Sequence, residues 1–181
     1  MDTASHDAQT SRPSVAAADD VDPDEIARRC AERMYATDRA SQELGIEISE
    51  VVPGRARAKM TVTEHMVNGH DLCHGGYVFL LADTAFAFAC NTYDQVTVAA
   101  SGDVVFVRSA LRGQQLVAEA VERVRHGRSG IYDVTVRTAD GDVIAEFRGG
   151  SRALGRPILD DDDAARTDDA SAADTGSKRT V

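Results

Sequence analysis

One carboxylate stands inside the most apolar stretch of the chain. Asp83 lies near the middle of the segment 75–90, in which the only other side chains able to hydrogen-bond are those of Tyr77, Thr84 and Cys90. An isolated charge in apolar surroundings costs free energy, so an acid in such a place usually has a chemical use. Asp83 is therefore the first candidate for a general base or a nucleophile.

A His-Gly-Gly turn, His74 to Gly76, stands directly before this segment. The first N–H groups of a helix have no partner inside it, and the positive end of the helix dipole lies there. Glycine has no Cβ, so a substrate carbonyl can approach the backbone closely. The Gly75 N–H is therefore a candidate donor for the negative charge that forms on a carbonyl oxygen under attack.

Asp83 follows Gly75 by eight residues. On one helix, at about 1.5 Å of rise per residue, their backbones are roughly 12 Å apart. A single chain cannot readily bring both groups to one carbonyl. Two antiparallel copies of the segment could, which predicts a homodimer in which Gly75 of one subunit faces Asp83 of the other.

Three neighbouring residues allow more than one interpretation. His74 could orient the loop, bind substrate or pack, and structural support is the favoured interpretation. Thr84 could hydrogen-bond a substrate or a water, or bond back to its own helix. For Cys73 a small buried hydrophobe is favoured over a nucleophile, because no oriented histidine partner is evident.

A metal site is an alternative use of the same region, since four potential ligands lie within ten positions of one another: His65, His70, Cys73 and His74. Asp83 could add a carboxylate. Zinc sites favour tight pairs such as C-x2-C or H-x3-H, which this spacing only approaches. The helix start already offers donors that polarise a carbonyl, so no metal and no other cofactor is expected.

The elements that must hold these groups follow from periodicity. Asp22, Pro23 and Glu25 predict a helix start with an aspartate cap, a first-turn proline and a capping box. This helix is expected to end before Gly45, where the apolar period changes to two. Apolar residues then alternate on both sides of a Pro53-Gly54 turn, which predicts a hairpin.

Four further strands are predicted after the apolar helix, over residues 96–108, 115–126, 129–137 and 143–153. Helix, hairpin, long apolar helix and four strands together indicate an α+β fold, an antiparallel sheet wrapped around a central helix. One domain is expected over residues 22–156. The polar segments 1–21 and 157–181 are expected to be disordered tails.

The acidity of the chain resides in those tails. Of the formal net charge of -10, the segments before Pro23 and after Arg156 carry 12 acids and 4 bases, which leaves 18 acids and 16 bases for the body. A nearly neutral body can carry arginine patches for an anionic ligand, and nucleic acid is not expected as a partner. With no apolar signal segment and three irregularly spaced cysteines, we expect a cytoplasmic protein without a membrane partner.

The central motif resembles the signature of PaaI-type acyl-CoA thioesterases, a branch of the hotdog-fold superfamily. The residues that carry the resemblance are Asn68, the turn 73–76, Phe79, the triplet 81–83 and Asn91. The segments 127–134 and 147–151 resemble later strands of the same family. The resemblance extends over roughly residues 24–154.

This resemblance implies a hotdog fold and hydrolysis of an acyl-CoA, of phenylacetyl- or hydroxyphenylacetyl-CoA type, to the free acid and coenzyme A. It also implies active sites at a dimer interface and a dimer of dimers, a homotetramer. Asp83 would act as base or nucleophile, Gly75 would hold the oxyanion and Asn68 would orient the thioester. For Asn68 the alternative is an Asn-Gly turn residue.

Coenzyme A brings phosphates, which arginine binds through its bidentate guanidinium. The candidates are Arg108, Arg128, Arg148 and Arg152. Arg128 is favoured, because glycines open the backbone of its turn and Ser129 adds a hydroxyl. Solvated sheet edges also recruit arginine, so some of the four are expected to serve only the surface. His74 and Thr84 complete the candidate substrate-binding residues.

Two other functions fit the same residues. A hotdog hydratase or dehydratase of acyl thioesters would need a histidine and an acid as a proton-transfer pair, for which His74 is available. A non-catalytic acyl-CoA-binding regulator would be stabilised by its ligand without needing Asp83.

Overall fold

The computed structural model describes residues 21–159. The tails expected at 1–21 and 157–181 lie almost wholly outside these residues, so their disorder and the domain limits stay predictions. The elements, in chain order, are α1 (Pro23–Tyr35), α2 (Arg39–Glu43), β1 (Glu47–Val52), β2 (Arg55–Thr61), the 3-10 helix η1 (Glu64–Met66), α3 (Gly75–Cys90), β3 (Thr97–Phe106), β4 (Gln115–His126), β5 (Ser129–Thr138) and β6 (Val143–Ala153).

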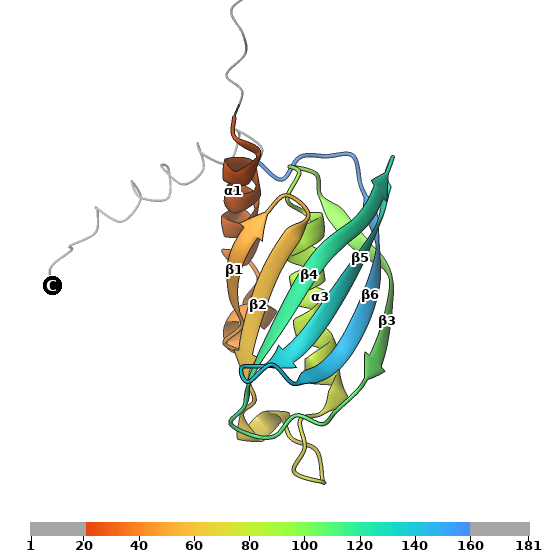
Figure 1. Cartoon of the computed structure of the whole chain (residues 1–181). Coiled ribbons are helices and arrows are strands. Elements are labelled where there is room, and N and C mark those ends of the chain that lie inside the picture. The colour runs from red at the N-terminus through yellow and green to blue at the C-terminus, as the bar shows by residue number, and fades with distance from the viewer. Residues whose placement is uncertain (1–20, 160–181) are drawn as a thin grey trace, which may run out of the picture.

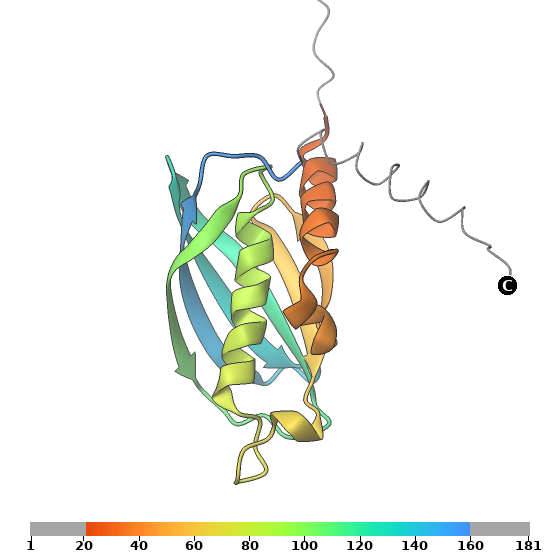
Figure 2. The same cartoon turned by 180° about the vertical axis from the view of Figure 1, so that it is seen from behind.

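The six strands form one antiparallel sheet in the order β1-β2-β4-β5-β6-β3. The sheet curves around α3, and α1 lies beside α3 over the β1 end of the same face (Figures 1 and 2). β3 follows α3 in the chain but pairs with the last strand, β6, and so forms the other edge of the sheet. The expected α+β hotdog architecture is confirmed.

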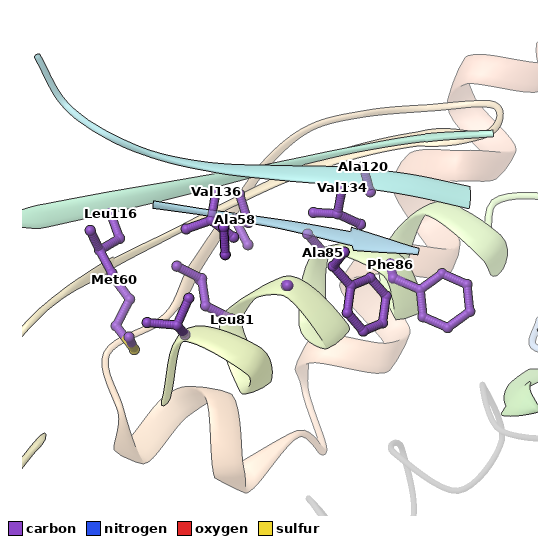
Figure 3. Packing of buried hydrophobic residues seen from close by; sticks show 14 of the residues in the cluster. Ala58, Met60, Leu81, Ala85, Phe86, Leu116, Ala120, Val134 and Val136 are labelled. Carbon is purple, nitrogen blue, oxygen red and sulfur yellow. The ribbon is translucent and has the colours of Figure 1, made fainter. Parts of the chain in front are cut away.

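α3 begins and ends where the sequence predicts. Its apolar side chains pack onto the inner face of the sheet, where Leu81, Ala85 and Phe86 are fully buried (Figure 3). The packing leaves no space for a side chain at Gly149 on β6, since a Cβ there would lie 2.8 Å from the Phe86 ring. Within the described part of the chain, no helix is both long and apolar enough to span a membrane.

Asn91 joins the end of α3 to the start of β3. Its side-chain amide donates to the carbonyl oxygens of Ala87 and Thr97, at 2.9 and 2.8 Å, and accepts from the Thr97 N–H at 2.8 Å. The residue is buried. These bonds set the direction in which β3 leaves the helix and runs back along it.

Two details of the first helical region are predicted wrongly. The single helix expected up to Gly45 stops at Tyr35, because Asp38 caps a second short helix by accepting from the Ser41 N–H. The N-cap itself is Asp22, as expected, with its carboxylate accepting from the Asp24 N–H. The capping box does not form, since the Glu25 carboxylate pairs with the exposed Arg28 instead.

Candidate active site

The His-Gly-Gly turn is the N-terminus of α3. His74 is the N-cap, and its imidazole Nδ1 accepts a hydrogen bond from the Gly76 N–H at 3.0 Å. Its carbonyl accepts from the Tyr77 N–H at 2.9 Å. No described residue accepts a hydrogen bond from the Gly75 N–H, and Gly75 lines a cavity of about 420 Å³. The favoured structural interpretation of His74 agrees with this geometry.

We expect the cap at His74 to be required for an ordered donor at Gly75. His74→Ala removes the acceptor of the Gly76 N–H, whereas His74→Asn keeps a side-chain acceptor at the cap. Steady-state kinetics should show kcat for the alanine variant lowered roughly tenfold, the equivalent of about 1–1.5 kcal/mol of cap free energy, with partial recovery in the asparagine variant. His65→Ala is the matched control, since His65 is exposed and caps no helix.

Asn68 is both a turn residue and a wall of the same cavity. Its side-chain oxygen accepts from the backbone N–H groups of His70 and Leu72, at 2.9 and 3.3 Å. Among the described residues, none accepts a hydrogen bond from its amide NH₂ group. The turn therefore fixes the orientation of the amide and leaves its NH₂ available beside Gly75.

Asp83 is half-buried on the second turn of α3 beyond Gly75. Its carboxylate forms no hydrogen bond or ion pair with any residue from 21 to 159. Burial raises the pKa of the carboxyl above its ordinary value. The hydroxyl of the neighbouring Thr84 is likewise without a partner in the described chain, so it does not bond back to its own helix.

The helix face that carries Asp83 runs along the outer strand β3. Gly75, Phe79 and Asp83 follow at intervals of four residues and so share this face. A Cβ on Gly75 would lie 2.9 Å from the Phe106 ring, and a Cβ on Gly102 would lie 3.3 Å from the Phe79 ring. Gly102 and Phe106 both belong to β3, a strand whose far edge has no partner strand in the described chain.

The four candidate arginines separate into different regions. Arg108 lines the cavity beside Gly75 and forms a 2.6 Å ion pair with Asp142. Arg148 lies on the outer face of the sheet, where it forms a bidentate pair with Asp133. Arg128 and Arg152 lie at the other end of β3, where Arg152 donates to the Ser129 hydroxyl at 3.3 Å.

No group of three or more His, Cys, Asp or Glu side chains in the described residues could hold a metal ion. The potential metal ligands considered from the sequence do not form one site. Cys73 is buried, and burial raises the pKa of its thiol, whereas His70 is exposed. Nδ1 of His74 is occupied by the helix cap.

Two residues of interest were not identified from the sequence. Phe106 lies against Gly75, and both residues line the same cavity. In the sequence Phe106 is distant from Gly75, near the end of a predicted strand. Ser151 lies in the segment 147–151 that carries the family resemblance, but nothing in the segment distinguishes its hydroxyl from an ordinary strand residue. Its burial, at 6% exposed, is visible only in the folded chain.

Comparison with known proteins identifies relatives of this chain. Residues 70–145 match the family model described as the thioesterase superfamily. The acyl-coenzyme A thioesterase PaaI of Escherichia coli K12 is 41% identical over 128 residues, which cover 71% of this chain and 91% of that protein. A putative esterase of Archaeoglobus fulgidus is 31% identical over 125 residues, 69% of this chain and 81% of its own length.

Solved structures give the same relationship. The E. coli PaaI protein from the phenylacetic acid degradation operon superimposes with a TM-score of 0.74 at 38% identity, over 75% of this chain and 99% of that one. A variant of the phenylacetic acid degradation protein PaaI from Thermus thermophilus gives 0.62 at 32% identity, over 65% and 100%. The motif, the fold and these relatives agree: the chain belongs to the thioesterase superfamily, as a PaaI-type member with the hotdog fold.

Proposed function

We propose that this protein hydrolyses an acyl-CoA thioester to the free acid and coenzyme A. The observation that carries the proposal is the pairing on one helix of an unpartnered, half-buried Asp83 carboxylate with a Gly75 N–H that has no acceptor among the described residues. A carboxylate of raised pKa is a suitable base or nucleophile near neutral pH. The relative named an acyl-coenzyme A thioesterase supports the substrate class.

The two groups act at one carbonyl when two copies of α3 lie antiparallel. Phe79 stands midway between Gly75 and Asp83, so a twofold axis close to Phe79 would bring Gly75 of each copy opposite Asp83 of the other. Because Gly102 lies next to Phe79, such an axis would pass near the middle of β3. The open β3 edge is long, and it carries the exposed apolar side chains Val105 and Phe106, which favours pairing with a second copy.

In this dimer the chemistry is shared. As a base, Asp83 removes a proton from the water molecule that attacks the thioester carbon. As a nucleophile, the Asp83 carboxylate attacks that carbon itself and forms an anhydride, which water then hydrolyses. The Gly75 N–H of the second copy and the Asn68 amide donate to the carbonyl oxygen as it becomes negative. Collapse of the intermediate breaks the C–S bond, and the thiolate of coenzyme A leaves and takes up a proton.

Arg108 is the proposed contact for the coenzyme A phosphates. It is exposed at the cavity that holds Gly75 and Asn68, so a bound coenzyme A would pass it on leaving the site. The ion pair between Asp142 and the Arg108 guanidinium keeps the Arg108 side chain extended. Arg148 is less suited to bind phosphate, because its guanidinium already forms two hydrogen bonds with Asp133 on the outer face of the sheet.

The alternatives are separated by one pair of measurements. Thiol release should be followed over aromatic and aliphatic acyl-CoAs, including phenylacetyl-CoA, and ligand binding should be measured on the same panel by calorimetry. A hydrolase releases thiol. A hydratase or dehydratase would transform an enoyl- or hydroxyacyl-CoA without thiol release, and a regulator would bind without turnover.

The donors at the start of α3 supply the polarisation that zinc would otherwise provide. We therefore expect hydrolysis to continue at an undiminished rate after exhaustive dialysis against a strong chelator, as measured by thiol release. If stoichiometric zinc were needed to restore a lost activity, the polarising role would pass from Gly75 to the metal.

A further inference from the structure

We propose that Phe106 is a positioning residue for the Gly75 N–H: its ring takes the place of a side chain at position 75 and keeps water away from this donor. The ring lies against the first residue of α3, whose N–H has no acceptor among the described residues. The inference rests on the proposed hydrolysis, in which the Gly75 N–H binds the carbonyl oxygen as it becomes negative.

The Phe106 ring meets Gly75 with its tip. A Cβ on Gly75 would lie 2.9 Å from Cζ of Phe106, 3.2 Å from Cε1 and 3.4 Å from Cε2. The first distance is well below the optimal separation of two carbon atoms, about 3.5–4.0 Å. From the sequence, the missing Cβ of Gly75 leaves space for a substrate carbonyl. In the folded chain the Phe106 ring fills that space.

The backbone that carries Phe106 is fixed relative to α3. β3 pairs with β6 up to Phe106 itself, and the Val107 N–H donates to the Ile144 carbonyl on β6 at 2.8 Å. Further along the chain, the Ala110 carbonyl accepts from the Cys73 N–H at 2.8 Å, in the turn that leads into α3. The ring therefore extends from a backbone that is held both to the sheet and to the start of the helix.

Phe106 forms an apolar wall beside both proposed oxyanion donors. The residue is 53% exposed, and it lines the cavity of about 420 Å³ together with Gly75 and Asn68. An apolar wall lowers the local dielectric constant and excludes water, and both effects strengthen a hydrogen bond to a negatively charged oxygen. The ring thus supports the transition state without touching the reacting atoms through a polar group.

The contact makes the sizes of residues 75 and 106 depend on each other. Gly75→Ala keeps the backbone N–H, but its methyl group displaces the ring. Phe106→Leu keeps the carbons near the backbone and removes Cε1, Cε2 and Cζ, the three ring atoms nearest Gly75. In the double variant the added methyl group occupies the space that the shorter leucine leaves.

The test is a double-mutant cycle followed by thiol release from phenylacetyl-CoA. Each single variant should lose roughly tenfold in kcat with little change in KM, since a donor is weakened in the transition state but not removed. The double variant should recover most of this loss, because the two changes are coupled. Phe106→Tyr should lose at least as much as Phe106→Leu, because its hydroxyl is attached to Cζ, the ring atom nearest Gly75.

Val124→Ala is the matched control and should keep the wild-type kcat. Val124 is an apolar strand residue, 52% exposed, that does not line the cavity beside Gly75. Native mass spectrometry and urea unfolding of each variant separate a defect of assembly or folding from a loss of kcat. If Gly75→Ala did not fold, the comparison of Phe106→Leu and Phe106→Tyr with the wild type would carry the test.

The loss should also be independent of the acyl group, because the oxyanion forms on the same carbonyl in every acyl-CoA. Phe106→Leu should therefore lower kcat by the same factor for phenylacetyl-CoA and hexanoyl-CoA. A second cavity, of about 120 Å³ beside Arg128, lies at the C-terminal end of α3, and neither Phe106 nor Gly75 lines it. A loss confined to one acyl group would make Phe106 part of an acyl-binding wall and overturn the inference.

Three further results would contradict the role of Phe106. They are a double variant no more active than the weaker single variant, a wild-type kcat in Phe106→Tyr, and a rise in KM without a fall in kcat. Any of them in an active wild-type background refutes this inference alone. A wild type that hydrolyses no acyl-CoA refutes the proposed function, and the positioning role falls with it.

Discussion

Asp83→Asn should lower kcat/KM for thioester hydrolysis by at least about a hundredfold, the range for a positioned acid or base. Asparagine has nearly the same shape but can neither take a proton from water nor attack the carbonyl carbon efficiently. Thiol release under steady-state conditions measures the loss. Asp24→Asn is the matched control, because Asp24 is an exposed acid on α1, far from α3 in the sequence and outside both cavities.

The same variant should be at least as stable as the wild type at neutral pH. Burial raises the pKa of Asp83 in the folded state, so the folded protein binds more protons than the unfolded chain between the ordinary and the raised pKa. The free energy of unfolding therefore falls as pH rises through that interval, and an asparagine escapes the loss. Urea unfolding at neutral pH checks this, and it separates a catalytic defect from a folding defect.

The pH profile offers a further check on Asp83. If the ionised carboxylate is the active form, kcat/KM should fall as pH decreases through its pKa, and the midpoint should lie above that of an ordinary aspartate. If Asp83→Asn showed near-normal turnover and the same fall in kcat/KM at low pH as the wild type, Asp83 would have no part in the mechanism.

Two inactive variants should restore each other when their subunits mix. Gly75→Pro removes the N–H donor while suiting the first helical position, and its ring would press on Phe106, which lies 2.9 Å from a Cβ placed there. Asp83→Asn retains Gly75. A mixed dimer contains one site with both wild-type groups and one site with neither.

Random exchange of equal amounts makes half of the dimers mixed, so roughly a quarter of wild-type activity should return. The chains would be unfolded together, refolded and assayed for thiol release, with native mass spectrometry to confirm the mixed species. Mixing two differently tagged Asp83→Asn chains is the control and should recover nothing. Mixed dimers that remain inactive would show that the site lies within one chain.

The elements that carry the site were predictable because their signals are local. α3 spans Gly75–Cys90 as predicted, since a glycine turn starts it and the apolar run ends at Asn91. β4 and β6 also have the predicted bounds, set by turn residues beside them. The end of the first helix was predicted wrongly for an equally local reason. The Asp38 side chain accepts a hydrogen bond from the backbone N–H of Ser41 and so caps a new helix.

The candidate pair Gly75 and Asp83 could be predicted before folding is considered, because residue type and helical spacing suffice to specify an oxyanion donor, a buried acid and the distance between them. The other side chains that lie near them could be identified only from the folded chain. Phe106 lies against Gly75 because β3, paired with β6 at the edge of the sheet, runs back along α3. Ser151 lines a cavity beside Arg128 because β6 pairs with β5, the strand that follows Arg128 in the chain. Such pairings join residues distant in the chain, and no local propensity encodes them.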